Sequence, residues 1–185
     1  IENLFTVVDL NDPDSLLPIK KSLTIEQNVL YGYDTEVVWV EGITDYNYLT
    51  LFKKLLGYKN IAFLPFNGVG NTKDQTKQIL KRLTEIKFHK RSLLVDGDKA
   101  GLDMFEQAKK TDFVNCVHNI SELSIGDKKP MMIEDLFSKE DKKKYTSILE
   151  KTGHGSSELK TIANKNSFSK ETLDNFKQLF ELLID

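Results

Sequence analysis

The sequence predicts an α/β fold, in which a mainly parallel sheet of about four strands carries helices on both faces. Between residues 36 and 120, short apolar runs rich in β-branched residues alternate strictly with stretches whose apolar residues recur at helical spacing. Parallel strands need such crossover helices, and strands buried on both faces are apolar throughout. Beyond residue 120 the pattern becomes mainly helical, so we expect a helical C-terminal extension.

The strand and helix patterns follow one another in a regular order. The expected strands are "EVVWVEG", ending near Glu41, then "NIAFLPF", "RSLLVDGD" and "DFVNCVHNI". The helices between them are expected over "TDYNYLTLFKKLLGY", "TKDQTKQILKRLTEI" and "AGLDMFEQAKK". Thr44 is the expected N-cap of the first helix and Gly57 its C-terminal stop. In the extension, "MMIEDLFSKEDKKKYTSILEK" and "SKETLDNFKQLFELLID" are expected to be helices separated by "GHGSS".

Composition places only broad limits on function. A chain of 185 residues is long enough for one domain with its own core. No apolar run approaches the roughly 18 residues of a membrane span, and the N-terminus has no signal-peptide pattern, so we expect a cytoplasmic protein. The first residue is not Met, which leads us to expect a fragment of a longer protein. Residues 1–35 are interpreted as a lead-in segment with a short helix near residues 15–23.

Acidic residues gather where the predicted strands end. Asp96 and Asp98 follow the third strand one residue apart, and Glu41 ends the first strand. Asp45 lies four residues beyond Glu41, on the first turn of the following helix, so the two side chains are expected to face the same side. Ligands of open α/β sheets bind at the carboxyl ends of the strands, so these side chains should converge. Oxygen ligands of this kind suit Mg²⁺ or Mn²⁺, and with the later Glu134 and Asp135 there are enough for two ions.

Each of these carboxylates also has a simpler interpretation. Asp98 could be the N-cap of the following helix, and Asp45, Glu134 and Asp135 could complement helix N-termini. Glu41 is the hardest to explain this way, because a Glu that closes an apolar strand is costly to bury without a partner. Other chemistry is less well supported. The three histidines are far apart, and "NGVGNTK" matches neither phosphate-binding glycine motif, although it could form a tight turn near a phosphate.

The motifs "VVWVEGITD" and, some fifty residues later, "LLVDGDKAG" resemble the TOPRIM domain of topoisomerases, primases and related nucleases. "VEGITDYNYL", "PFNGVGN" and "MIEDLF" are most similar to the C-terminal TOPRIM region of the OLD (overcoming lysogenisation defect) family of ATPase-linked nucleases. The resemblance implies a Rossmann-like TOPRIM core over residues 36–125. Residues 126–185 would be a helical extension that completes the site. Residues 1–35 would link to an upstream ATPase.

The resemblance also implies roles for individual residues. Glu41, Asp45, Asp96 and Asp98 match the family's metal ligands. Asp135 matches a later acidic position, and its neighbour Glu134 is an alternative for it. Such nucleases use a downstream lysine, for which Lys160 is the first candidate and Lys165 the reserve.

The expected function is that of a DNA endonuclease that depends on Mg²⁺ or Mn²⁺, with two ions and with ATP acting only through the absent upstream domain. A role in phage defence follows from the family. The expected partners are DNA, the upstream ATPase and, as an option, a second copy of the chain, with no membrane. Eight lysines against four acids between residues 139 and 170 could contact DNA phosphates, although a solvated helix face explains them too. The lysines expected to contact DNA are Lys142, Lys143, Lys144 and Lys165. The alternative function is a non-catalytic module that binds metal, nucleotide or DNA and docks a partner.

Overall fold

The structure is a computed structural model, and it describes residues 34–66, 72–86, 88–113, 115–152 and 167–184. For residues 146–152 only the backbone is described. Almost all of the expected lead-in, including the helix near residues 15–23, lies outside the described residues. The loop "NGVGN" and the "GHGSS" break also lie outside them.

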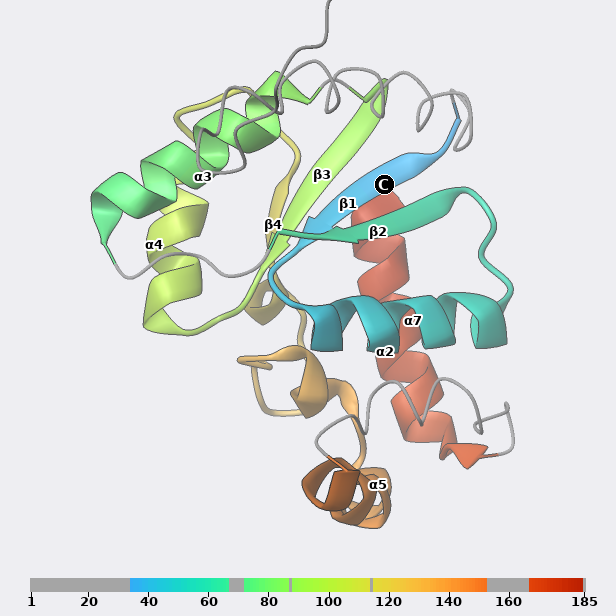
Figure 1. Cartoon of the computed structure of the whole chain (residues 1–185). Coiled ribbons are helices and arrows are strands. Elements are labelled where there is room, and N and C mark those ends of the chain that lie inside the picture. Colours follow the sequence, from blue (N-terminus) through green and yellow to red (C-terminus); the bar gives the residue numbers. More distant parts are fainter. Residues whose placement is uncertain (1–33, 67–71, 87, 114, 153–166, 185) are drawn as a thin grey trace, which may run out of the picture.

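A four-stranded sheet forms the centre of the fold. Its strands are β1 (Glu36–Val40), β2 (Ile61–Pro65), β3 (Lys90–Val95) and β4 (Val117–Asn119). All neighbouring strands are parallel, and their order is β2-β1-β3-β4 (Figure 1). The predicted α/β fold with a parallel sheet of about four strands is therefore confirmed.

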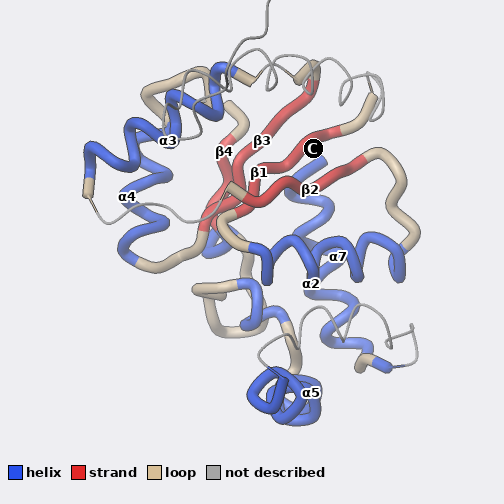
Figure 2. The backbone as a smooth tube through the Cα atoms, in the orientation of Figure 1, coloured by secondary structure: helices blue, strands red, loops and turns tan. Residues whose placement is uncertain are grey.

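Helices cover both faces of this sheet. The α-helices of the described residues are α2 (Ile43–Leu56), α3 (Lys73–Glu85), α4 (Lys99–Ala108), α5 (Lys139–Thr152) and α7 (Lys170–Ile184). The 3-10 helices η1 (Ile120–Glu122) and η2 (Ile133–Leu136) connect β4 to α5. Figures 1 and 2 show α3 and α4 together on one side of the sheet, and α2 and α7 on the other. None of the helices in the described part of the chain is both long and apolar enough to cross a bilayer.

Alternate residues of each central strand enter different cores, which explains why the strands are apolar without interruption. Val38 and Val40 belong to the core under α2 and α7. Val37 and Trp39 belong to the core under α3 and α4. A polar residue at any of these positions would be buried, because each of the four side chains is less than 10% exposed.

Several predicted boundaries change in the structure. Gly42, and not Thr44, is the N-cap of α2, because the helix already begins at Ile43. Gly57 ends α2 in the left-handed conformation with a φ of 82°, as predicted. The fourth strand is only three residues long. The helix predicted from "MMIEDLF" starts as η2 and stops at Phe137, and α5 begins afresh where Ser138 Oγ accepts from the backbone N–H of Asp141 (3.1 Å).

The C-terminal helix α7 is part of the main core. Phe176 is fully buried and its ring stacks on Phe52 of α2, with centroids 3.5 Å apart and planes 8° apart. A polar network joins the starts of α5 and α7, where Asp141 accepts hydrogen bonds from the Thr172 hydroxyl and from the backbone and hydroxyl of Ser169. The described residues of η2, α5 and α7 therefore contribute to the same core as the sheet.

Replacing Phe176 by Ala should lower the free energy of unfolding by about 3–5 kcal/mol, because it removes a buried ring and leaves a cavity. Chemical denaturation followed by circular dichroism measures this. The matched control is Ile184→Ala on the same helix, which should change stability by less than about 0.5 kcal/mol because Ile184 is half exposed. A small effect of Phe176→Ala would show that α7 contributes little to the core.

Candidate metal centre

The strand order places the ends of β1 and β3 at a topological switch point. From β1 the chain crosses through α2 to β2 on one side, and β3 lies on the other side of β1. Crevices that bind ligands form at this position in open α/β sheets. Glu41 follows β1 directly and Asp96 follows β3 directly, so both carboxylates stand at the carboxyl edge of the sheet beside this point.

Asp96 is the centre of a group of interacting carboxylates. Burial is the main cause that raises its pKa, which lies at about 8 against a usual value of 3.8. Negative charges raise it further, and they come, in decreasing order, from Asp45, Glu41, Glu134 and Asp98. Such through-space repulsion requires the groups to be near one another. The fold thus brings five acidic residues from α2, from η2 and from the ends of β1 and β3 to one place, which we call the carboxylate cluster.

Asp45 belongs both to this cluster and to the start of α2. Burial raises its pKa to about 6, although the backbone N–H of Gly42 donates a hydrogen bond to its Oδ2 (2.9 Å) and opposes that shift. The charge of Glu134 then raises the pKa further. The helix-capping interpretation of Asp45 is therefore correct, and the hydrogen bond also fixes the carboxylate beside its acidic neighbours.

Asp98 has two roles in the same way. It is the N-cap of α4, and its Oδ1 accepts a hydrogen bond from the backbone N–H of Gly101 (2.7 Å). The residue is exposed. An ionised carboxylate has two oxygens, each with more than one acceptor site. Capping the helix through Oδ1 is thus compatible with binding a cation through Oδ2.

The turn that carries Asp96 is packed tightly against three neighbours. A Cβ added to Gly101 would lie 2.2 Å from the carbonyl oxygen of Asp96, so only Gly fits at this position of α4. The same carbonyl accepts a hydrogen bond from Asn119 Nδ2 (2.7 Å) at the end of β4. The backbone N–H of Gly97 donates to the carbonyl of Met131 (2.7 Å). A Cβ on Gly97 would lie only 3.1 Å from Met131 Cα, so close packing explains both glycines of "DGDKAG" and leaves the Asp96 backbone little freedom.

Glu134 and Asp135, which the sequence leaves as alternatives, take different roles. Burial raises the pKa of Glu134, and its charge acts on Asp45 and Asp96. Burial also raises the pKa of Asp135, but hydrogen bonds from Met131 N and from Lys142 Nζ (3.0 Å each) outweigh it and leave the pKa low. Asp135 thus shapes the loop whose Met131 carbonyl holds Gly97, and Glu134 is the member of the cluster.

Two residues of the site have no role in the sequence-based interpretation. Tyr48 is a fully buried core residue of α2. Burial raises the pKa of its phenol, followed by the charges of Glu134 and Asp45, so the buried phenol lies within the field of the cluster. Asn119 is almost fully buried and holds the Asp96 carbonyl. Its place at the carboxyl end of a strand beside β3 is the signal that could have identified it.

The lysines expected in catalysis and DNA binding are only partly described. Lys160 and Lys165 lie outside the described residues. Lys142 forms an ion pair with Asp135 (3.0 Å), and Lys144 Nζ donates to the carbonyl of Ser167 (3.3 Å). Lys143 is exposed at the start of α5. Two of the three described lysines therefore have partners within the chain.

Carboxylates of this kind have the right chemistry for Mg²⁺ or Mn²⁺, but they are spread out in the structure. Within the described ranges, no three acidic, His or Cys side chains stand close enough together to hold one ion as they are placed. A cation would have to draw some of the side chains inward. Attraction between a cation and the acidic groups around Asp96 would favour this movement.

Comparison with protein-family models, curated proteins and solved structures finds no match to this chain. The resemblance to TOPRIM domains consequently depends on the quoted motifs. The site described above depends on the chain's own geometry. We therefore treat the family and its activity as a proposal.

The carboxylate cluster predicts how stability changes with pH when no metal is bound. The pKa of Asp96 is about 8 and that of Asp45 about 6, so the folded chain binds these protons more tightly than the unfolded chain does. The resulting stabilisation is complete below about pH 4 and is lost progressively as pH rises, up to about pH 6 for Asp45 and about pH 8 for Asp96. Asp96→Asn cannot gain the charge. In chelator, the variant should melt above the wild type at about pH 9 and close to it at about pH 4.

Melting curves across this pH range provide the measurement, and the difference between variant and wild type removes effects of other groups. Asp127→Asn, on an exposed turn, is the control and should follow the wild type. If Asp96→Asn and the wild type lose stability in parallel, Asp96 is not protonated in the way the structure indicates.

Proposed function

We propose that this chain is a TOPRIM-type nuclease domain of the OLD family, which hydrolyses DNA phosphodiester bonds with Mg²⁺ or Mn²⁺. The observation that supports the proposal is the convergence of carboxylates from several separate segments at the switch point of the sheet. A carboxylate cluster of this size is electrostatically unfavourable by itself and favourable around divalent cations. Two metal ions would account for the number of carboxylates.

Bound cations would act as Lewis acids that lower the pKa of water and neutralise negative charge on the reacting phosphate. The chain's own part is to hold them. Glu41, Asp96 and Asp98 would be their main ligands, with Asp45 and Glu134 completing the set. Asn119 and Gly101 fix the backbone of Asp96, so its carboxylate does not depend on a mobile turn. A lysine would add positive charge, and Lys160 remains the first candidate.

The wider setting belongs to the same proposal. An upstream ATPase domain would bind ATP, the protein would act in the cytoplasm in phage defence, and two copies could assemble on DNA. One observation favours a second function, namely a metal- or DNA-binding module without catalysis. Within the described ranges no three acidic, His or Cys side chains are grouped closely enough to hold one ion as they are placed, so a module that binds DNA, or binds a metal only loosely, without cleaving is the alternative. Cleavage assays separate the two functions.

Asp98→Asn should reduce nicking of supercoiled plasmid in Mg²⁺ or Mn²⁺ by at least about 100-fold, since changes even behind a metal's direct ligands cost about 10- to 100-fold. Asn is preferred to Ala here because it keeps the cap on Gly101 N and removes only the charge. Asp127→Asn is the control of equal charge change. Nicking by Asp98→Asn at the wild-type rate would place the site elsewhere. A wild type that does not nick but melts higher with Mn²⁺ would support the binding module.

Glu134→Gln and Asp135→Asn should affect different properties, the first the response to Mn²⁺ and the second the stability without metal, although the residues are neighbours. Glu134→Gln should abolish most of the rise in melting temperature that Mn²⁺ causes, and should lower the cleavage rate, because it removes a member of the cluster. Asp135→Asn should keep the response to Mn²⁺ but lower stability by about 0.5–1 kcal/mol, because it weakens the exposed bonds to Met131 and Lys142. Thermal melting in a Mn²⁺ titration measures both, and the reverse result would make Asp135 the ligand.

A further inference from the structure

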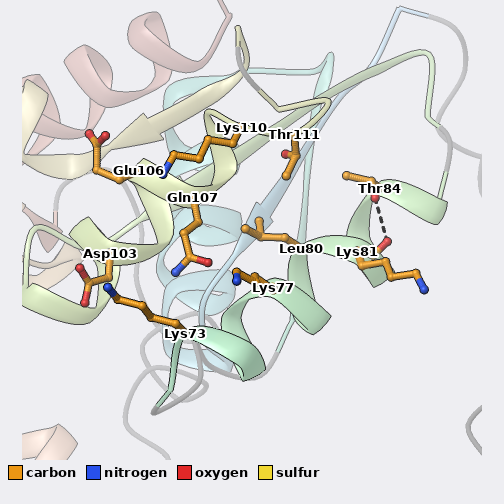
Figure 3. A pocket seen from close by; sticks show the side chains of 10 residues that line it. All are labelled: Lys73, Lys77, Leu80, Lys81, Thr84, Asp103, Glu106, Gln107, Lys110 and Thr111. Atoms are coloured by element: carbon orange, nitrogen blue, oxygen red, sulfur yellow. Dashed lines mark hydrogen bonds between the residues drawn. The ribbon is translucent and has the colours of Figure 1, made fainter.

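We infer that the groove between α3 and α4 binds the phosphate backbone of DNA and leads it to the carboxylate cluster. This inference rests on the proposed function, because it names the surface by which the substrate would approach. A hollow of about 640 Å³ lies between the two helices. Figure 3 shows the side chains that line it. Lys73, Lys77 and Lys81 of α3 line it, and Lys110, just after α4, completes the set of cations.

The hollow continues to the proposed metal centre. A second hollow of about 440 Å³ is lined by Asp98 and Lys99 at the start of α4 and by Thr72 at the start of α3. The two hollows share Lys73, Asp103 and Gln107 as lining residues. They therefore form one groove, which we call the α3–α4 groove. It begins at a proposed metal ligand and extends away from it along both helices.

The spacing of its lysines fits a phosphate backbone. Lys73, Lys77 and Lys81 are four residues apart, so they lie along one side of α3. At 1.5 Å per residue they span about 12 Å, which is the length of three to four nucleotide steps of 3.4 Å along duplex DNA. All three are exposed. Lys77 pairs with Asp74 only at 4.0 Å on the surface, and a pair of this kind is weak enough to exchange for a phosphate.

The charge balance of the groove also favours a polyanion. Apart from Asp98, its acidic residues are Asp103 and Glu106 on α4, and Lys109 Nζ lies 3.4 Å from the Glu106 carboxylate and partly neutralises it. Five lysines line the groove in all, and they are Lys73, Lys77, Lys81, Lys99 and Lys110. The cations therefore outnumber the acids even before a metal ion neutralises Asp98.

The polar and apolar lining indicates which part of DNA the groove receives. Both hollows lack aromatic side chains among their lining residues, so no platform for base stacking is present there. Gln107, which lines both hollows, has a buried Oε1 with no hydrogen-bond partner among the described residues. A lysine ammonium of the groove that moves toward this oxygen would donate to it. The groove should therefore bind backbone without reading sequence.

The test is DNA binding by the variant Lys77→Gln, Lys81→Gln, Lys110→Gln, which spares Lys73 and Lys99 beside the metal centre. The probe is a fluorescent duplex of about 25 base pairs in chelator, and anisotropy is followed over a salt series. Each lost phosphate contact should reduce the slope of log K against log salt by about 0.9, so the variant should lose about 2–3 units of slope. Affinity at low salt should fall by about tenfold or more.

The matched control is Lys54→Gln, Lys59→Gln, Lys177→Gln, which removes the same charge from exposed positions of α2, the turn before β2, and α7. The control should keep the wild-type slope. An unchanged slope in the groove variant, an equal loss in the control, or a wild type that does not bind the duplex overturns the inference. Displacement of the duplex by millimolar ATP but not by equal phosphate would also overturn it in favour of a nucleotide site.

Binding in chelator is independent of cleavage, so the two proposals fail separately. If the wild type nicks plasmid and the groove variant binds DNA normally, the groove inference is wrong and the nuclease proposal stands. If the groove variant loses binding and the wild type never nicks, the groove inference stands and the nuclease proposal is wrong. Asp98→Asn should bind the duplex in chelator at least as well as the wild type.

Discussion

The burial of Asp96 beside four other carboxylates is the constraint on which the rest of the site depends. Burial first and the neighbouring charges second raise the pKa of Asp96 to about 8, so ionised Asp96 is unfavourable at this position unless a cation is bound. The turn that carries Asp96 is not free to move, because Gly101 packs against the Asp96 carbonyl and Asn119 donates to it. The structure thus keeps these acidic groups together by fixing the main chain, and the packed core behind the turn supplies the free energy for this.

That core explains why the supports come from distant parts of the chain. Asn119 ends β4, Met131 belongs to the loop before η2, and both hold the turn after β3. The loop in turn is shaped by Asp135 and Lys142 at the start of α5. Since α7 closes the same core through Phe176, the C-terminal helices stabilise the sheet edge that carries the carboxylates.

Much of the fold could be predicted from sequence because it depends on local pattern. Continuous apolar runs gave the parallel strands, and helical periodicity gave α2, α3 and α4 between them. The carboxylate cluster could also be predicted from the sequence, because the carboxyl ends of parallel strands meet at one edge of the sheet. The predicted N-cap of α2 was wrong by two residues. Gly42 is the N-cap, and its backbone N–H donates to the Asp45 carboxylate, an arrangement that the residue type at the N-cap does not predict.

The remaining features depend on tertiary placement, which periodicity does not record. Glu134 and Asp135 are neighbours of the same type in the sequence. Only their placement on η2 shows that Glu134 belongs to the carboxylate cluster and that Asp135 bonds to the loop at Met131. The high number of lysines after residue 139 likewise led to the prediction that they contact DNA, but two of them have partners within the chain. The lysines of α3 give no functional signal in the sequence, because an amphipathic helix normally has lysines on its solvent-exposed face.

The α3 lysines suggest a function because of their position beside the start of α4. A nuclease site has to attract a polyanion to a place that is itself strongly negative, and metal ions at the carboxylates solve only the last step of that approach. A row of cations beginning next to Asp98 and running outward would supply the longer-range attraction. It would do so without placing an ammonium among the carboxylates, where it would pair with them and compete with the metal. Separating the two signs of charge onto adjoining elements of one fold allows both requirements to be met.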